Sequence, residues 1–198
     1  MRPGNMRGIC LLGALLLFAA IASPARAQAP VTSDDVINRL TGLETAPDLN
    51  VAAIRQRALD RVKAKAEPVP LKRPRVAPEL LKLTQLLVDV QFDPDSAIVR
   101  PQSYQTLGVI ADALVRAAML PYGILIVGRT ESTGRRDNNL TLSQRRADSI
   151  RDVLVTTFKI SSKRLQALGL GEEQLQDANQ PASIVNRQVQ IVTIAKAP

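Results

Sequence analysis

The stretch that most constrains the fold of this chain is an apolar run from Tyr122 to Val127, which ends at Gly128 and leads into a polar loop. A continuous run of apolar and β-branched residues predicts a strand that helices cover. From Asn139 onward, apolar residues recur at spacings of three and four, which predicts a helix with one buried face. We therefore expect a strand, a loop and a helix packed together within an α/β domain.

The predicted helix carries an arginine within its apolar face. Arg146 lies four residues after Leu142 and four before Ile150, so its side chain projects from the same stripe. Desolvating a guanidinium that has no partner costs several kcal/mol. We therefore expect Arg146 to meet a carboxylate, which belongs either to Glu131 in the preceding loop or to a ligand. Arg145 shares a face with polar residues and is expected to be solvated.

Flanking segments complete a βαβαββ order over residues 81–198. Alternation from Leu86 to Phe92 predicts a first strand, and Arg100-Pro101 precedes a helix, because proline suits a first helical turn. Two further strands are expected, at Leu165 to Gly169 and at Gln188 to Ile194. This order predicts an α/β (α+β) sandwich, a mixed sheet with helices on one face.

Five short motifs between residues 85 and 195 resemble, in their order, those of the OmpA-like peptidoglycan-binding domain. They are VQFDPDSA from Val90, GRTE from Gly128, NLTLSQRRA from Asn139, GLGE from Gly169 and NRQVQI from Asn186. The corresponding family patterns are VxFDxxSA, GHTD, NxxLSxxRA, GYGE and NRRVEI. The order of the five makes the resemblance more specific than any one of them.

The resemblance implies non-covalent binding of diaminopimelate, the zwitterionic residue of peptidoglycan stem peptides. Glu131 takes the position of the family's aspartate and Arg146 that of its arginine. A carboxylate suits the ligand's ammonium group, and a guanidinium forks onto its carboxylate. The resemblance extends the candidate ligand-binding set to Thr130, Asn139, Leu142 and Arg187.

Two departures from the family pattern leave the binding open. The family's histidine is Arg129 here, and its aspartate is Glu131, which is one methylene longer. The longer carboxylate could reach Arg146 and close the site, which would leave a scaffold that binds no ligand. Arg187 shares strand parity with Val189, so it either adds a positive group beside the pocket or pairs with Asp93 or Asp95.

Residues 1–27 have the form of a secretory signal peptide. A basic start is followed by an apolar run from Ile9 to Ala22 and by an A-x-A cleavage site that ends at Ala27. The alternative is an uncleaved anchor, although the run is shorter than the roughly 20 residues of a membrane span. Cleavage removes Cys10, the one cysteine of the chain. We expect the protein in the periplasm, associated with the outer membrane or the cell wall.

The composition excludes several kinds of chemistry. With no histidine in the chain and no cysteine after cleavage, histidine triads, thiol nucleophiles and ordinary zinc sites are ruled out. Asp93 and Asp95 could act as an acid–base pair, but a turn explains them better. We expect no enzyme, no catalytic residue, no metal and no cofactor. The net charge of +8 suits anionic envelope polymers, and we expect no nucleic acid partner for an exported protein.

The N-terminal part reads as two short helices and a linker. In residues 28–66, Ser33 can cap a first helix, and a basic amphipathic helix is expected from Asn50 to Ala66. That second helix lies either on an anionic membrane or a partner, or against the folded domain. Residues 67–80 contain four prolines among basic residues, which predicts a solvated linker.

These observations leave two functions open. The first is a non-catalytic envelope protein that binds peptidoglycan and links the envelope to the cell wall. The second is a structural or interaction protein on the same fold, which has lost peptidoglycan binding and contacts an anionic membrane or an envelope protein through its basic N-terminal helix.

Overall fold

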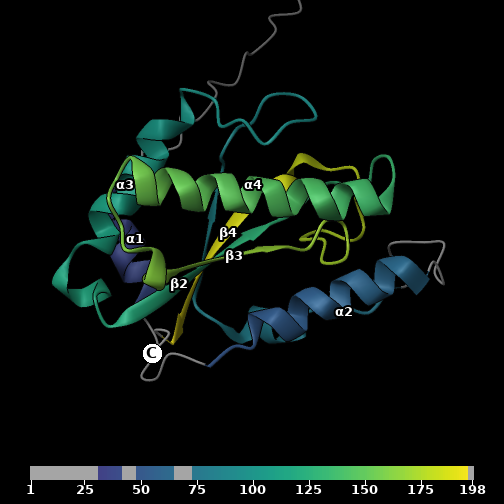
Figure 1. Ribbon diagram of the computed structural model, residues 1–198, viewed down its shortest axis with the longest axis horizontal. Helices are drawn as coiled ribbons and strands as arrows, with labels where there is room; N and C mark the ends of the chain where they lie inside the picture. Colours follow the sequence, from purple (N-terminus) through teal and green to yellow (C-terminus); the bar gives the residue numbers. More distant parts are fainter. Residues whose placement is uncertain (1–30, 42–47, 65–72, 196–198) are drawn as a thin grey trace, which may run out of the picture. The chain divides into compact units, whose positions relative to one another are not determined.

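The computed structural model describes residues 31–41, 48–64 and 73–195. The predicted signal peptide, residues 28–30, residues 42–47, the last two residues of the predicted second helix (65–66), residues 67–72 of the predicted linker and residues 196–198 lie outside these ranges. The helices and strands follow one another as α1 (Ser33–Leu40), α2 (Val51–Ala64), β1 (Gln85–Val88), α3 (Ser103–Leu114), β2 (Tyr122–Gly128), α4 (Arg136–Thr156), β3 (Leu165–Gly169) and β4 (Val189–Ala195) (Figure 1). No helix within the described ranges is long and apolar enough to cross a bilayer.

The four strands form one mixed sheet in the order β1-β4-β2-β3. Strands β2 and β3 are parallel, whereas β4 runs antiparallel to both of its neighbours, β1 and β2. From β1 onward the chain therefore has the predicted βαβαββ order. The central strands β2 and β4 are buried over nearly their whole length, so the predicted covered strand is confirmed.

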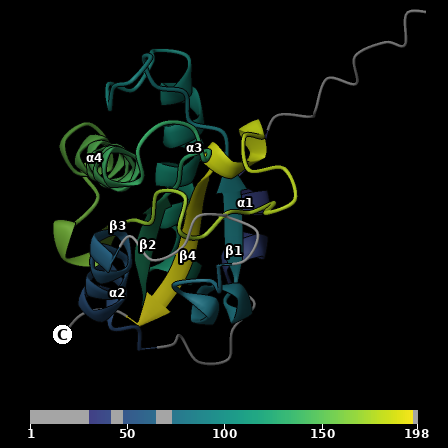
Figure 2. The ribbon, with the colours of Figure 1, turned by 90° about the vertical axis from the view of Figure 1, so that its right-hand side faces the viewer.

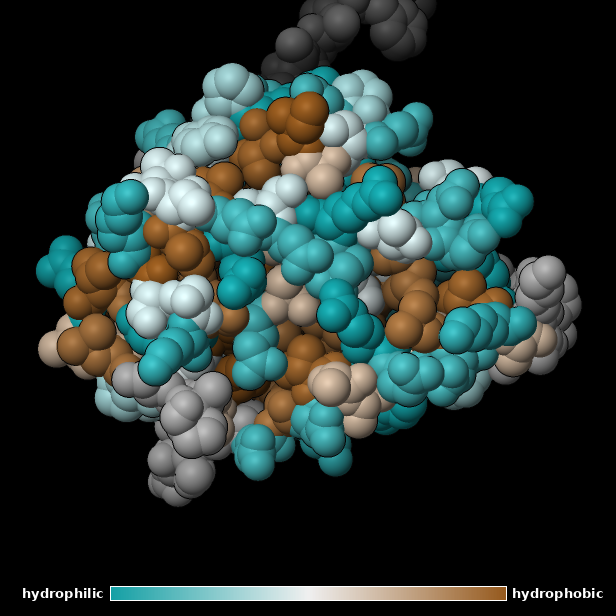
Figure 3. All heavy atoms as spheres, in the orientation of Figure 1, coloured by the Kyte–Doolittle hydropathy of each residue, from teal (hydrophilic) through white to brown (hydrophobic). Residues whose placement is uncertain are grey.

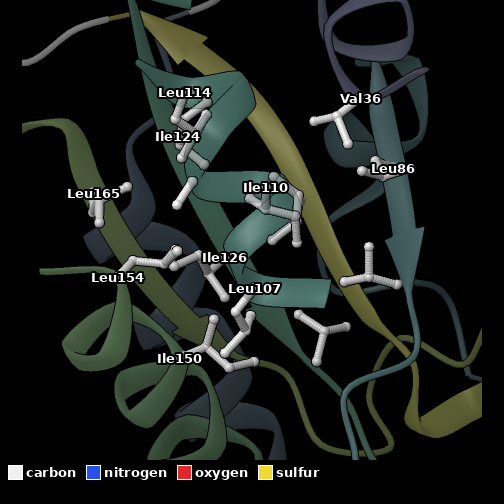
Figure 4. Packing of buried hydrophobic residues seen from close by; sticks show 14 of the residues in the cluster. Val36, Leu86, Leu107, Ile110, Leu114, Ile124, Ile126, Ile150, Leu154 and Leu165 are labelled. Atoms are coloured by element: carbon white, nitrogen blue, oxygen red, sulfur yellow. The ribbon is translucent and has the colours of Figure 1, made fainter. Parts of the chain in front are cut away.

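The first face of the sheet packs against α1, α3 and α4. Ile124 and Ile126 of β2 meet Ile110 of α3 and the α4 residues Ile150 and Leu154, all of them at most 1% exposed (Figure 4). Burying each such aliphatic side chain contributes about 1.5–3 kcal/mol. The helices of the βαβαββ repeat thus lie on one face, as predicted.

The opposite face is covered by α2, whose placement the sequence analysis had left open, and by the segment that precedes β1. Leu125 and Val127 of β2 pack with Val192 and Ile194 of β4 against Ile54 of α2 and the segment that precedes β1. Figure 2 shows α2 in front of the sheet and α3 behind it. Because β2 and β4 are apolar on both sides, both faces need cover, and α2 supplies part of it. The packing of α2 corresponds to the second of its two predicted placements.

Residues 73–80 differ from the solvated linker that their prolines predicted. Val76, Ala77 and Leu80 are at most 2% exposed. The backbone N–H of Ala77 donates to Gln174 Oε1 at 2.7 Å, and Gln174 Nε2 donates back to the carbonyl oxygen of Ala77 at 2.7 Å. This part of the chain therefore belongs to the folded unit, and the predicted domain boundary after residue 80 lies too late in the sequence.

Two helices also begin earlier than predicted. The N-cap of α1 is Thr32 rather than Ser33, and its side chain and that of Asp35 form a reciprocal capping box. Helix α4 begins at Arg136, within the stretch that the sequence analysis assigned to a loop before Asn139.

Candidate functional site

A cleft of about 370 Å³ brings together three of the predicted site residues. Glu131 comes from the loop after β2, Arg146 from α4, and Arg187 from the 3₁₀ helix Ile184–Arg187 that precedes β4. The other walls are formed by the segment between β1 and α3, including Phe92, Asp95 and Arg100. The cleft therefore joins the three predicted residues from elements that are distant in sequence. Its lining contains four carboxylates (Asp89, Asp93, Asp95 and Glu131) and three guanidiniums (Arg100, Arg146 and Arg187).

Close contact between α4 and two strand ends fixes this geometry. A Cβ atom on Gly128 would lie 2.2 Å from the carbonyl oxygen of Ser143, and one on Gly169 would lie 2.2 Å from the backbone nitrogen of Gln144. Only glycine allows helix and strand backbones to approach this closely. The backbone N–H of Thr130 donates to the carbonyl oxygen of Gly171 at 3.1 Å, which ties the loop after β2 to the loop after β3.

Arg146 is half-buried and held from one side. Its Nε donates to the carbonyl oxygen of Ser96 at 2.9 Å, and its guanidinium carbon lies 5.0 Å from the centre of the Phe92 ring. Such a cation–π contact orients the guanidinium plane. Within the described chain, no hydrogen bond uses the two Nη groups. The prediction that Arg146 projects from a buried face of α4 therefore agrees with its position, and its outer edge is left for a partner.

Neighbouring charges act on Arg146 in opposite directions. Burial lowers the pKa of Arg146 from its ordinary value, and the positive charge of Arg187 lowers it further. The carboxylates of Glu131 and Asp95 act in the opposite direction and raise that pKa. An additional anion in the cleft would therefore be stabilised by two guanidiniums at once.

Glu131 does not pair with Arg146, although its extra methylene could have let it reach that guanidinium. Its Oε1 lies 3.7 Å from Arg187 Nη1, and the side chains of Glu131 and Arg187 are 23% and 49% exposed. An ion pair of this length and exposure contributes at most about 1 kcal/mol. A ligand can therefore displace it at little cost.

Arg187 is the last residue of the 3₁₀ helix that precedes β4, so it lies just outside the strand, at whose mouth the sequence analysis had placed it. It reaches the cleft, as one of its two predicted alternatives required, and its ion pair is with Glu131. Asp93, one of the partners considered for it, is 3.1 Å from Arg100 Nε instead. Sequence reasoning missed Phe92 and Arg100 as cleft residues, although both lie in the motif region before α3.

The remaining predicted site residues do not line the cleft. Thr130 is 4% exposed, and its Oγ1 has no hydrogen-bond partner within the described residues. Asn139 is buried, and its Nδ2 donates to the carbonyl oxygen of Thr133 at 3.0 Å and to Glu172 Oε2 at 2.7 Å, which fixes the loop. Leu142 lines a second cavity, on the other side of the segment around Ser96.

Arg129, which replaces the family's histidine, is 2% exposed. Its Nη1 donates to Gln176 Oε1 at 3.0 Å and its Nη2 donates to Gln190 Oε1. Burial lowers the pKa of Arg129 to about 10, with a further contribution from the positive charge of Arg75. Arg129 is not among the residues that line the cleft, so the change from histidine acts on the interior of the domain.

A buried ionic cluster, missed by the sequence analysis, supports the loop after β3. We use this name for Arg73, Arg136, Glu172 and Glu173. Glu173 accepts two hydrogen bonds from Arg136, both at 2.9 Å, and Arg73 Nη1 lies 3.1 Å from Glu172 and 3.4 Å from Glu173. The glutamate side chains are 3% and 1% exposed. Such charges are stable only when paired, so the cluster is structural.

Comparison with known proteins gives consistent matches. Residues 91–188 match the sequence profile of the OmpA family. The chain is similar to outer membrane porin F of Pseudomonas aeruginosa, with 30% identity over 61% of this chain and 34% of the porin. It is also similar to the probable lipoprotein YiaD of Escherichia coli (34% identity, 52% of this chain, 47% of YiaD) and to a peptidoglycan-associated lipoprotein of Brucella melitensis (36% identity, 42% of this chain, 48% of the lipoprotein). The chain thus spans less than half the length of these relatives.

Among solved structures, the peptidoglycan-associated lipoprotein from Burkholderia pseudomallei matches with 27% identity and a TM-score of 0.43, over 63% of this chain and 98% of that one. An outer membrane protein from Borrelia burgdorferi B31 matches with 28% identity and a TM-score of 0.44, over 55% of this chain and 86% of that one.

Proposed function

Because residues 91–188 form a domain of the OmpA family, we propose that this protein binds peptidoglycan without catalysis and links the cell envelope to the cell wall. The observation that carries the proposal is the half-buried guanidinium of Arg146, whose Nη groups bond to nothing in the described chain, beside Glu131 and Arg187. The names of two relatives, a peptidoglycan-associated lipoprotein and an outer membrane porin, support the same location and partner.

The cleft fits diaminopimelate chemically. The free end of this residue carries an ammonium and a carboxylate, so it needs an acceptor and a donor side by side. Arg146 forks onto the carboxylate through its two Nη groups, while Glu131 leaves Arg187 and accepts from the ammonium. Arg187, once released, adds a second positive charge near the ligand carboxylate. A volume of about 370 Å³ suits one residue of this size.

The envelope is where such a ligand occurs. The predicted signal peptide of residues 1–27 exports the chain, and its mature part meets peptidoglycan in the periplasm. Attachment of the protein at or near the outer membrane would then make it a link between that membrane and the wall.

The test is co-sedimentation of the purified protein with insoluble peptidoglycan. Wild type is expected in the pellet with the diaminopimelate polymer and mostly in the supernatant with a polymer in which lysine replaces diaminopimelate, because lysine lacks the second carboxylate. Arg146→Ala is expected to stay in the supernatant. Arg116→Ala removes an exposed arginine that does not line the cleft and serves as the matched control. Wild type that fails to sediment with the diaminopimelate polymer would contradict the proposal.

The second candidate function is an interaction protein that uses its basic helix. One observation favours it, namely that α2 keeps Arg55 and Lys63 exposed while its apolar side packs on the sheet. This function predicts flotation of the protein with phosphatidylglycerol vesicles but not with phosphatidylcholine vesicles. The double variant Arg55→Glu, Lys63→Glu would abolish flotation and leave peptidoglycan sedimentation unchanged.

A further inference from the structure

A groove lies between α2 and α4, beside the edge strand β3. It has two sections that share Arg55. The larger section, of about 510 Å³, is also lined by Val51, Gln56, Asp148 and Arg151, and the smaller one, of about 190 Å³, by Leu59, Leu140 and Arg145. We call the whole the α2–α4 groove and its smaller section the apolar end. No residue that lines the groove also lines the cleft around Arg146, so the proposed binding of diaminopimelate leaves the groove unused.

Side chains of α4 occupy the free edge of β3. Gln144 Oε1 accepts from the backbone N–H of Gly169 at 2.7 Å, and its Nε2 donates to the carbonyl oxygen of Ala167 at 3.4 Å. Arg151 Nε donates to the carbonyl oxygen of Leu165 at 3.2 Å. An extended peptide that binds along the edge of a sheet needs such backbone groups to be free. The groove therefore favours a ligand that requires no backbone pairing.

Two guanidiniums lie at the apolar end without partners. Arg55 of α2 and Arg145 of α4 both line it and are exposed, and among the described residues neither side chain forms an ion pair or a hydrogen bond. The one carboxylate in the lining of the groove, Asp148, lines the larger section and accepts from Gln144 at 3.0 Å. Two unpaired positive charges around one small space attract an anion, and guanidiniums bind phosphate through paired hydrogen bonds.

The space beside these guanidiniums is apolar. Leu59, which is 37% exposed, and Leu140, which is 7% exposed, contribute its lining together with Gly169 of β3. Figure 3 shows hydrophobic surface between α4 and α2, bordered by hydrophilic surface. A volume of about 190 Å³ is below the roughly 300 Å³ of a usual small-molecule site, so it accepts a short length of hydrocarbon and not a whole ligand. A ligand that fits has an anionic group next to a hydrocarbon chain.

We propose that the α2–α4 groove binds a single anionic phospholipid, with the phosphodiester between Arg55 and Arg145 and the first part of one acyl chain in the apolar end. The inference rests on the second candidate function and gives it a defined site, which two helices build together. The predicted export of the chain brings it next to membrane phospholipid. A phospholipid fits better than an acidic peptide because its charge adjoins its hydrocarbon and because its binding uses no backbone group of β3.

Isothermal titration of the purified protein with three soluble probes tests the inference, the lipids being kept below their micelle-forming concentrations. Dihexanoyl-phosphatidylglycerol carries both the negative charge and the chains. Dihexanoyl-phosphatidylcholine carries the chains without a net charge, and glycerol phosphate carries the charge without chains. Wild type is expected to bind the phosphatidylglycerol at least about tenfold more tightly than either other probe, because a charge-assisted hydrogen bond or the burial of about two methylenes each gives such a factor.

Variants of the two helices separate the charge from the chain. Arg145→Gln should weaken binding of the phosphatidylglycerol about tenfold and leave that of the phosphatidylcholine unchanged. Leu59→Ser should weaken binding of both lipids and change that of glycerol phosphate less than about twofold. Both substitutions replace exposed side chains, so the midpoint of urea denaturation should not move. The matched control, Lys63→Gln, removes an exposed cation of α2 that does not line the groove, and it should leave all three affinities unchanged.

Equal affinities of wild type for the phosphatidylglycerol and for glycerol phosphate would overturn the inference, as would an unchanged affinity for the phosphatidylglycerol in Arg145→Gln. If the protein still floated with phosphatidylglycerol vesicles in either case, the second candidate function would stand without this site. Sedimentation with peptidoglycan measures the first proposed function separately. Tighter binding of an acidic peptide, with tetraglutamate as the probe, than of the phosphatidylglycerol would also overturn the inference and would identify the groove as a contact for protein.

Discussion

The cleft around Arg146 and the buried ionic cluster around Glu173 use the same kinds of side chain in opposite ways. In the cluster, Glu173 accepts two bonds of 2.9 Å from Arg136 and is 1% exposed. In the cleft, Glu131 and Arg187 are 3.7 Å apart and partly exposed, and Arg146 uses only Nε. A buried set of charges in which each charge is paired stabilises the fold. A partly exposed set at a cleft, in which the pairing is incomplete, is available to a ligand.

The buried ionic cluster should give the largest change in stability. Glu173→Gln leaves Arg136 without its bidentate partner and Arg73 with one carboxylate fewer, so we expect a loss of about 3–5 kcal/mol in the free energy of unfolding. Urea denaturation measures it. The matched control, Glu79→Gln, breaks an exposed pair with Arg57 and should cost less than about 1 kcal/mol. Equal losses in the two variants would remove the contrast between the regions.

The cleft should respond in binding and not in stability. Arg146→Lys keeps the charge but removes the two-pronged donor, so affinity for diaminopimelate should fall about tenfold. The midpoint of urea denaturation should move little. The guanidinium of Arg146 already loses solvation in the folded state, so its replacement by an ammonium group removes little net stabilisation. Titration calorimetry and denaturation of the same preparation give both values. Full affinity in Arg146→Lys would mean that a point charge suffices there.

A substitution of Arg129 tests whether a buried guanidinium that has no carboxylate partner contributes to the stability of the fold. Its pKa is lowered to about 10 by burial, so its protonated form is disfavoured by folding at all pH values below that. Arg129→Met removes this cost and also the bonds to Gln176 and Gln190, and we expect the two effects to cancel within about 1 kcal/mol. The sign follows from the lowered pKa: wild type should gain stability relative to Arg129→Met as the pH rises above 10. Urea titrations at pH 8 and pH 10.5 measure the difference.

The smallest effect is expected for Glu131→Asp, which restores the residue of the family motif. The shorter side chain releases Arg187 from a pair that contributes at most about 1 kcal/mol, and that pair must break when the ligand binds. Affinity for diaminopimelate should therefore rise, by no more than about fivefold, and the unfolding free energy should fall by no more than about 1 kcal/mol. Weaker binding by Glu131→Asp would show that the length of glutamate fits the ligand.

The sequence predicted the βαβαββ core because its apolar periodicity is local and regular. The run from Tyr122 to Val127 also contained the information that both faces of β2 are covered, since residues of both parities are apolar. The cover itself was not predictable, because α2 contributes only Ile54 and Ala58 as fully buried residues. So few apolar positions do not distinguish a docked helix from a free amphipathic one.

The candidate site was partly predictable for the same physical reasons. Helix periodicity placed Arg146 at the apolar face of α4, and the motif order brought Glu131 and Arg187 near it. The sequence did not reveal pairings between distant segments, such as the pairing of Arg73 with Glu172, which are 99 residues apart. Leu142 lies one helical turn from Arg146, but the segment around Ser96 separates the two side chains. Sequence spacing does not reveal such a partition.

The close contacts at Gly128 and Gly169 have a mechanical consequence. If the protein tethers a membrane to the wall as proposed, it is pulled through its ligand, and that pull enters at Arg146 on α4. Because α4 meets the ends of β2 and β3 backbone to backbone, that load passes directly into the hydrogen-bonded ladder of the sheet. A methyl group at either glycine would hold α4 away from the strands. Under tension, the contact between helix and sheet would then fail before the ligand dissociates.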